Sequence, residues 1–420
     1  MNFFAEPPVS RKVFAGIFLL KVLMGVALWA IYTFYYTNRA EADIYKYFDD
    51  SAVMFNALKE NPDHYIQMLS GINEDASHLM PYYADMTSWD NKDFLYNDNR
   101  TMIRLNAFFR LFSFGFYHVH SVFMVFLSFI GLTGIFKIFN RIKPGRASEF
   151  ILACFLLPSI LFWTSGVLKD SLLISALGLT LFSLYKLLQK YQHKYLLLLV
   201  ISMLILLFIK LYIIIAILPG MIAWLWSHIT GYKKVWLKFA IAYLIYFTVG
   251  LNIHYVFPDY DVVYLIYLKQ HNFLNLAADV GAGSVIDIYK LEPNFQSLLI
   301  SAPEAFKNTL FRPYFFESFS PLILLAGIEN LLLIIILIFY LFHFTIILND
   351  HQKPLLWFSI FFVIILFVLI GLVTPVMGAM VRYKAPALPF LIGIFIILSD
   401  NEKINSILLK ITARFRKKSP

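Results

Sequence analysis

An acidic segment directly follows the first long apolar stretch of the chain. It contains Glu41, and if it is helical, one of its faces carries Asp43, Lys46, Tyr47 and Asp50. A carboxylate at this place can act as a general base on an acceptor hydroxyl or hold a divalent cation against a phosphate group. A solvated helix with ordinary acidic caps is the alternative interpretation. We therefore treat Asp43, Asp50 and Glu41 as candidate catalytic residues.

A second candidate group lies at a turn between two apolar runs. The turn at residues 164–166 is soon followed by Lys169, Asp170 and Ser171. A lysine and the free N–H groups at a helix N-terminus suit the phosphate of a membrane lipid. Capping of a helix at the membrane boundary explains the same residues equally well, so both interpretations stay open.

Basic residues in the last third of the chain form two further candidate groups. Arg312 precedes an apolar run that contains Glu329. Its planar guanidinium suits a phosphate or a carboxylate, so Arg312 either binds a ligand or forms a structural ion pair with Glu329. Arg382, Tyr383 and Lys384 precede the last apolar run. They suit a lipid-linked phosphate, or else form a basic and aromatic anchor at the membrane interface.

The composition predicts that membrane-spanning helices position all these residues. Of the 420 residues, 60% are hydrophobic and 15% are charged, and the mean hydropathy is +0.70. Apolar runs of about 20 residues recur along the chain, and each is long enough to cross a bilayer. The net charge of +9 comes largely from lysine and arginine at the ends of these runs, where they set orientation. We expect membrane lipids as partners and no nucleic acid.

We predict an all-α polytopic membrane protein with about ten transmembrane helices, forming a single domain over residues 1–420. The expected spans are 13–36, 114–139, 150–163, 171–188, 195–209, 211–229, 235–256, 321–348, 355–373 and 385–398. Arg11 and Lys12 before the first span place the N-terminus in the cytoplasm. The C-terminus is then cytoplasmic too, within a basic tail at residues 400–420.

Two large loops with short helices, residues 37–104 and 258–320, are expected on the outer side. The first contains 12 of the 26 acidic residues, so acidity is concentrated on one face of the membrane. It also carries four aromatic residues among acids and amides: Tyr82, Tyr83, Trp89 and Tyr96. These rings either stack on sugars or form the small core of a folded loop.

Several catalytic signatures are absent from the sequence. It contains no phosphate loop, no GxGxxG motif, no HExxH motif and no Cys/His metal pattern. The single cysteine, Cys154, lies inside an apolar run and excludes a disulfide framework. His118 and His120 lie on different faces of a helix, which argues against a shared metal. We therefore predict no metal-ligand cluster and no certain cofactor.

These motifs together resemble the membrane-embedded glycosyltransferases of the C-type fold, which use polyprenyl-phosphate-linked sugars. The resemblance rests on Glu41 and Asp43 after the first span, the large outer loop, the segment from Pro158 to Asp170, and residues 382–389. It implies that Asp43 is the base or metal holder. It also implies that Lys169, Arg312 and Arg382 bind the lipid phosphate. The sequence has Glu-Ala-Asp in place of the family's acidic pair, so a divalent cation is possible but not required.

The resemblance implies an enzyme that moves a sugar from a polyprenyl-linked donor to a glycan, lipid or protein acceptor. Its site would face the periplasm or exterior of a bacterial inner membrane, in cell-surface glycan synthesis. Polysaccharide repeat-unit polymerases share these features and form the alternative. A transporter or flippase of lipid-linked glycans is a weaker alternative, because only Lys21 and Glu329 lie clearly inside spans.

Overall fold

The computed structural model describes residues 2–36, 38–39, 42–89, 98–317, 320–345, 347–400 and 403–404. The secondary structure of these residues is helical, and in place of strands they have only isolated bridges such as Val285 with Val376. Glu41 and Tyr96 lie outside the described residues, as does most of the predicted basic tail.

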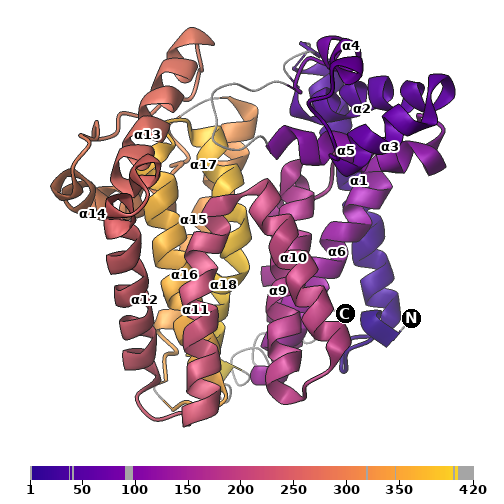
Figure 1. Ribbon diagram of the computed structural model, residues 1–420. Helices are drawn as coiled ribbons and strands as arrows, with labels where there is room; N and C mark the ends of the chain where they lie inside the picture. The colour runs from indigo at the N-terminus through magenta and orange to yellow at the C-terminus, as the bar shows by residue number, and fades with distance from the viewer. Residues whose placement is uncertain are drawn as a thin grey trace. The chain divides into compact units, whose positions relative to one another are not determined.

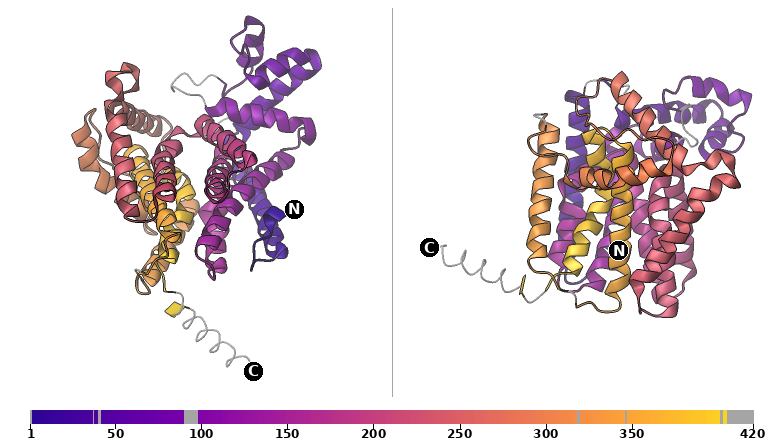
Figure 2. Two further views of the ribbon diagram at one scale, coloured as in Figure 1. Left: turned by 60° about the horizontal axis from the view of Figure 1, so that its bottom comes forward. Right: turned by 90° about the vertical axis from the view of Figure 1, so that its left-hand side faces the viewer.

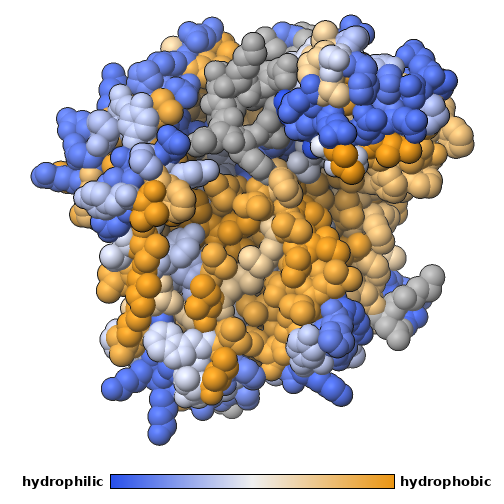
Figure 3. Space-filling model, viewed as in Figure 1, coloured by the Kyte–Doolittle hydropathy of each residue, from blue (hydrophilic) through white to orange (hydrophobic). Residues whose placement is uncertain are grey.

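Eight helices in the described residues are long and apolar enough to cross a membrane. They are Arg11–Tyr35, Tyr117–Ile142, Lys169–Gln189, Leu211–Thr230, Val235–Tyr255, Pro321–Leu341, Gln352–Val373 and Met377–Ile397. Apolar residues cover the length of such helices and hydrophilic residues gather at their ends (Figure 3). The predicted polytopic helical membrane protein is confirmed. The two remaining predicted spans correspond to shorter apolar helices, Ala147–Leu156 and His193–Ile209.

The chain divides into two compact units, which is a finer division than the single domain expected from the sequence. Unit 1 comprises residues 1–137 and 160–214, and unit 2 comprises residues 138–159 and 215–420.

Unit 1 contains most of the first ten α-helices. Their bounds are α1 (Arg11–Phe34), α2 (Asp43–Glu60), α3 (Pro62–Ser70), α4 (Met80–Ala84), α5 (Asp98–Ser113), α6 (Tyr117–Ile142), α8 (Pro158–Trp163), α9 (Lys169–Gln189) and α10 (His193–Ile209). Helices α9 and α10 pack side by side (Figure 1). Helix α9 also crosses α6 closely. At the crossing there is no room for a side chain, since a Cβ atom added at Gly178 would lie 2.0 Å from the carbonyl oxygen of Gly131. Small residues at this crossing let the two backbones approach.

Between the first two spans, unit 1 forms a small folded layer built on the contact between α2 and α5. Trp89 is 1% exposed and stacks on Tyr83 with ring centroids 4.3 Å apart. Arg100 and Arg104 lie over the Trp89 ring and both pair with Glu74. Of the two interpretations of the loop aromatics, the structure therefore places Trp89 and Tyr83 in the core of a folded loop.

Unit 2 contains the remaining α-helices and four short helical turns. The α-helices are α7 (Ala147–Ile151), α11 (Leu211–Thr230, from residue 215 on), α12 (Val235–Asn252), α13 (Val262–Asp279), α14 (Phe295–Phe311), α15 (Pro321–Leu341), α16 (Gln352–Val373), α17 (Met377–Lys384) and α18 (Leu388–Ile397). The turns are the π-helical η3 (Leu152–Leu156) and the 3-10 helices η4 (Ile253–Tyr255), η5 (Pro258–Tyr260) and η6 (Ala385–Ala387). Helix α16 packs against α14 and α18, and it runs beside α18 in two views (Figures 1 and 2). At the contact with α14, a Cβ atom at Gly371 would lie 2.1 Å from the carbonyl oxygen of Ala305.

Two local details differ from the expected spans. The predicted span 150–163 is interrupted at Leu157, whose ψ of 129° is extended. Pro158 disfavours a helical conformation at the residue before it and has no N–H to donate, so a new helix starts there. Conversely, residues 377–384 were expected in an outer loop but form α17, which continues through η6 into α18. Pro386 lies between α17 and α18, but it sits in the short 3-10 helix η6, which connects the two helices without a loop.

Candidate functional site

The strongest candidate site lies in unit 1 and is centred on Lys169. Lys169 is the first residue of α9 and follows Leu168, which is extended. Its buried ammonium lies 2.6 Å from Asp98 Oδ1 and 2.6 Å from Asn99 Oδ1. The half-buried carboxylate of Asp43, in the first turn of α2, interacts electrostatically with this ammonium. Two motifs that are far apart in the sequence therefore contribute to one cluster.

A second lysine completes this cluster. Lys210, the C-cap of α10, lies 3.5 Å from Asp98 Oδ2, so Asp98 bridges two ammonium groups. The ring of Tyr47 lies under Lys169, with its centroid 5.3 Å from Nζ. We call Asp43, Tyr47, Asp98, Lys169 and Lys210 the acid–lysine cluster. It combines a carboxylate that can accept a proton with cations that can neutralise an anion.

The charge of Asp98 depends on its two lysine neighbours. Burial by itself raises the pKa of the Asp98 carboxyl, but the ammonium groups of Lys210 and Lys169 outweigh burial and hold this pKa below its usual value. Asp98 is therefore a carboxylate at neutral pH, and it holds the two lysines in fixed positions.

Asp98 and Lys210 were not among the candidate residues from the sequence. Lys210 carried a signal, since it is a lone charge between two apolar runs, but a tight outer turn explains such a residue as well. Asp98 lies in an acid-rich loop where nothing distinguishes it from its neighbours. Its role depends on the packing that places Asp98 beside Lys169 and Lys210.

The turn before Lys169 is held by a buried lysine of the first span. Lys21 is fully buried in α1, and its ammonium donates to the Thr164 hydroxyl at 2.6 Å, the Thr164 carbonyl at 3.1 Å and the Ser165 hydroxyl at 3.2 Å. Every hydrogen-bond partner described for this ammonium is neutral. Lys21 thus ties α1 to residues 164–165 and helps position the start of α9.

The other described acidic candidates, Asp50 and Asp170, are buried. Asp50 accepts hydrogen bonds from the backbone N–H and hydroxyl of Thr87 and from the backbone N–H of Ser88. Burial raises the pKa of Asp50 even though these hydrogen bonds oppose the shift. Asp50 therefore ties residues 87–88 to α2. Asp170 is buried in the first turn of α9, where a negative charge favours the helix.

In unit 2, Lys384 caps the end of a helix. It is 3% exposed, and its ammonium donates to the carbonyls of Thr309 at 3.1 Å and Arg312 at 2.8 Å and to Asn330 Oδ1 at 3.0 Å. The two carbonyls belong to the last turn and C-cap of α14, which lack partners within the helix. Lys384 therefore joins α14 to α15.

Glu329 and Arg312 take partners other than each other. Glu329 accepts from the backbone N–H of Ser159 at 2.9 and 3.1 Å and from the Ser159 hydroxyl at 2.5 Å. It thereby caps α8, the helix that begins at Pro158. Arg312 pairs with Glu317 at 3.3 Å. Among the described residues, the alternative ion pair between Arg312 and Glu329 is therefore not formed.

Arg312 retains one unsatisfied donor. Its Nε is buried and has no hydrogen-bond partner among the described residues. Arg382 and Tyr383 are half-buried in α17. These three residues and Lys384 belong to unit 2, whereas Asp43, Lys169 and Asp170 belong to unit 1.

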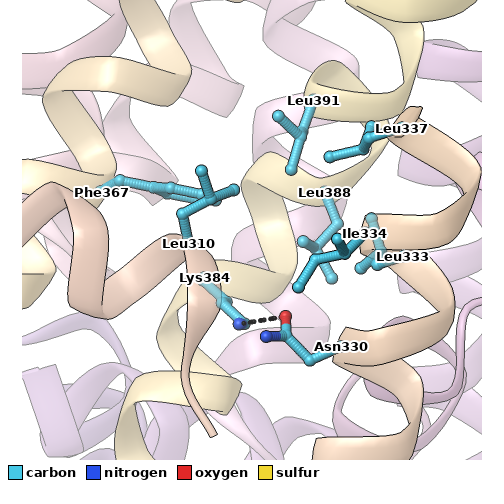
Figure 4. A pocket seen from close by; sticks show the side chains of 9 residues that line it. All are labelled: Leu310, Asn330, Leu333, Ile334, Leu337, Phe367, Lys384, Leu388 and Leu391. Carbon is cyan, nitrogen blue, oxygen red and sulfur yellow. Dashed lines mark hydrogen bonds between the residues drawn. The ribbon is translucent and has the colours of Figure 1, made fainter. Parts of the chain in front are cut away.

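A small apolar pocket adjoins Lys384 in unit 2. Lys384 and Asn330 lie at one end of it, and Leu388, Phe367 and Leu337 are among the apolar residues that form the rest (Figure 4). Its cavity volume is about 10 Å³, which is room for about one water molecule. Since the ammonium of Lys384 already has three acceptors, this pocket offers mainly apolar contacts.

The described residues contain no group of three or more His, Cys, Asp or Glu side chains that could hold a metal ion. Compared with known proteins, the chain matches no family model, no curated protein and no solved structure.

Proposed function

We propose that this integral membrane protein is a glycosyltransferase that moves a sugar from a polyprenyl-linked donor to an acceptor hydroxyl. The observation that supports it best is the acid–lysine cluster, in which a candidate base, Asp43, and a candidate phosphate ligand, Lys169, act on each other. Each residue was predicted for its role independently, from a different part of the sequence.

In the proposed reaction, Asp43 accepts the proton of the acceptor hydroxyl. The acceptor oxygen bonds to the anomeric carbon of the donor sugar, and the bond between that carbon and the phosphate oxygen breaks. Its electron pair stays on the phosphate, which leaves with the polyprenyl chain. No other reactant is required.

The charges of the cluster suit this transfer. Asp43 and Asp98 balance Lys169 and Lys210 before the reaction. When Asp43 takes up the acceptor proton, these four groups gain a net positive charge, at the moment when negative charge develops on the phosphate. Such electrostatic stabilisation is commonly the largest catalytic contribution in a site that excludes water. Tyr47 and Asp98 hold Lys169 in place for this role.

Within unit 1, Lys169 is our proposed contact for the lipid phosphate. Within unit 2, the sequence's candidates for the same chemistry are Arg312, Arg382, Tyr383 and Lys384. Of the four in unit 2, Arg312 has the clearest support, because its buried Nε can donate to a phosphate oxygen. Lys384 has the least, because protein acceptors already surround its ammonium. We place the reaction at the outer face of a bacterial inner membrane, with the acceptor a glycan, a lipid or a protein.

The test is a transfer assay with the purified protein in lipid vesicles and radiolabelled polyprenyl-phosphate and polyprenyl-diphosphate sugars. Addition of a single sugar to an acceptor supports the proposal. A ladder of repeat units would instead identify a polymerase. Movement of the intact donor across the bilayer without sugar transfer would identify a transporter, and either result would refute the proposal.

A further inference from the structure

Exposed apolar side chains gather in unit 1 where α5 leads into α6. Phe108, Leu111 and Phe112 are spaced at i, i+3 and i+4, so they share one face of α5. Phe114 and Phe116 follow in the turn before α6. All five side chains are exposed, from 40% for Leu111 to 87% for Phe114. We call these five residues the α5–α6 surface. It lies at the membrane boundary, because α6 begins at the next residue and is long and apolar enough to cross a membrane.

Phe114 adopts a backbone conformation that bulky residues rarely take. Its φ is +52°, in the left-handed region that favours glycine. The next residue, Gly115, has a φ of +81°. Among the described residues, the ring of Phe114 has no aromatic or cationic partner. A side chain that strains the backbone and gains no such contact within the protein is explained by a partner outside it.

Arg110, on α5 just before this turn, is a buried cation without a paired carboxylate. It is 8% exposed, and its Nε and Nη2 donate to the Ser51 hydroxyl at 2.8 Å and the Phe48 carbonyl at 2.5 Å. The carboxylate that acts on it electrostatically, Asp49, is paired with Arg39. Buried charges are normally paired, because an isolated charge away from water is costly. The two hydrogen bonds tie α5 to α2, but both acceptors are neutral.

The remaining nitrogen of this guanidinium is available to a ligand. No hydrogen bond from Arg110 Nη1 occurs among the described residues, and Nη1 is not one of the buried atoms that lack a partner, so it reaches the surface. It lies beside the exposed Gly115, where an added Cβ would be 3.3 Å away. Nη1 can therefore donate hydrogen bonds to an anion at the turn that carries Phe114.

We infer that the α5–α6 surface binds an anionic phospholipid of the surrounding membrane. The lipid phosphate accepts hydrogen bonds from Arg110 Nη1, and its acyl chains pack against Phe112, Phe114 and Phe116. A guanidinium suits the geometry of a phosphate, and aromatic residues at the end of a span lie where headgroups meet acyl chains. Free phosphate would leave the rings in water. A second copy of the chain, packed by two-fold symmetry, would bring two Arg110 side chains together.

This lipid site is distinct from the acid–lysine cluster and does not depend on the proposed function. Asp98 of the cluster and Arg110 stand at opposite ends of α5, about 18 Å apart along the helix axis. A phospholipid held by Arg110 would keep the C-terminal half of α5 in the membrane interface. It would thereby fix the depth at which Asp98, on the same rigid helix, meets Lys169 and Lys210.

The test is native mass spectrometry of the purified full chain, titrated in detergent with dioleoylphosphatidylglycerol or dioleoylphosphatidylcholine. We expect one site that binds phosphatidylglycerol about tenfold more tightly, because the guanidinium favours a headgroup with net negative charge. Inorganic phosphate should not displace the lipid.

Three variants locate the site. Phe114→Gly should weaken phosphatidylglycerol binding about tenfold, since apolar contact with the ring is lost. It should also keep or raise the midpoint of thermal unfolding, because glycine adopts the left-handed backbone without strain. Arg110→Lys should weaken binding too, since an ammonium cannot reproduce the guanidinium fork. Phe208→Ala removes a half-exposed ring at the end of α10 and should leave binding unchanged.

Several results would overturn the inference. They are equal binding of the two lipids, displacement by inorganic phosphate, and a folded Phe114→Gly variant that binds phosphatidylglycerol as the wild type does. A dimer that dissociates in Phe114→Gly would show that a second copy covers this surface. Lys169→Met separates the inference from the proposed function, because it should lose sugar transfer and still bind phosphatidylglycerol as the wild type does.

Discussion

Two lysines that start from similar sequence contexts have different surroundings in the two units. Lys169 of unit 1 faces the carboxylate of Asp98 and the amide of Asn99. Lys384 of unit 2 faces two backbone carbonyls and one amide. An ammonium that faces a carboxylate on a neighbouring loop helix can exchange that anion for another. An ammonium that caps a helix cannot leave without exposing the carbonyls.

The acidic residues Asp98 and Glu329 differ between the two units in the same way as the lysines. Asp98 of unit 1 bridges two lysines, whereas Glu329 of unit 2 caps α8 through Ser159. The comparison teaches that charge beside a span is not a sufficient sign of function. The surrounding acceptors and donors decide whether the charge stays available to a ligand.

Lys169→Met tests the functional side of this comparison and should have the largest effect. We expect sugar transfer to fall at least about 100-fold, because the leaving phosphate loses a cation in a site with little water. The fold should persist, since Lys210 still neutralises Asp98. Initial rates in vesicles measure the change, and Lys59→Met on the exposed side of α2 is the control. Equal rates for the two variants would remove Lys169 from the site.

Lys384→Met tests the structural side. It leaves the carbonyls of Thr309 and Arg312 without a donor, so we expect a loss of stability of about 1–3 kcal/mol, the usual cost of buried acceptors left unsatisfied. Thermal unfolding in detergent measures this, with Lys307→Met as the exposed control on α14. If Lys384→Met were as stable as the control, the structural role given to Lys384 would be wrong.

Asp98 should make the stability of the protein depend on pH. Because its pKa is lowered in the folded state, its carboxylate stabilises the fold above its unfolded pKa of about 4. That contribution is lost as the pH falls through the folded pKa. Asp98→Asn should cost about 1.5–3 kcal/mol at pH 7, typical of a hydrogen bond to a charged group. Unfolding curves of wild type and variant should converge below about pH 4; a constant gap at all pH values would contradict this.

The exposed pair Arg39–Asp49 should have the smallest effect. Its side chains are about half exposed, and the two charges lie 2.7 Å apart. Exposed ion pairs contribute about 0–1 kcal/mol. Asp49→Asn should therefore change the midpoint of unfolding little and leave transfer unchanged. A larger loss would indicate that the start of α2 depends on this pair.

The sequence was sufficient to predict the helical membrane architecture, because apolar runs of about 20 residues with basic residues at their ends are typical of membrane-spanning helices. It also singled out Asp43 and Lys169 as candidates, and the structure places both in unit 1. The pairing of Lys169 with Asp98 was not predictable, since it depends on how two segments that are far apart in the sequence pack together. The capping role of Lys384 was not predictable either, because the backbone carbonyls of α14 that it binds leave no trace in the sequence. A proline at position 158 is a sequence signal for a break in the helix. The hydrogen bonds from Ser159 to Glu329 carry no such signal, because they depend on packing between distant helices.

The central claim is that Asp43 accepts the proton of the acceptor hydroxyl. The most direct test compares Asp43→Asn with Asp49→Asn in the vesicle transfer assay, because both residues lie on α2 and each variant removes one charge. The account predicts that Asp43→Asn loses transfer by at least about 100-fold, the usual contribution of a general base, while Asp49→Asn keeps the wild-type rate. Full transfer by Asp43→Asn, with donor and acceptor bound normally, would contradict the account.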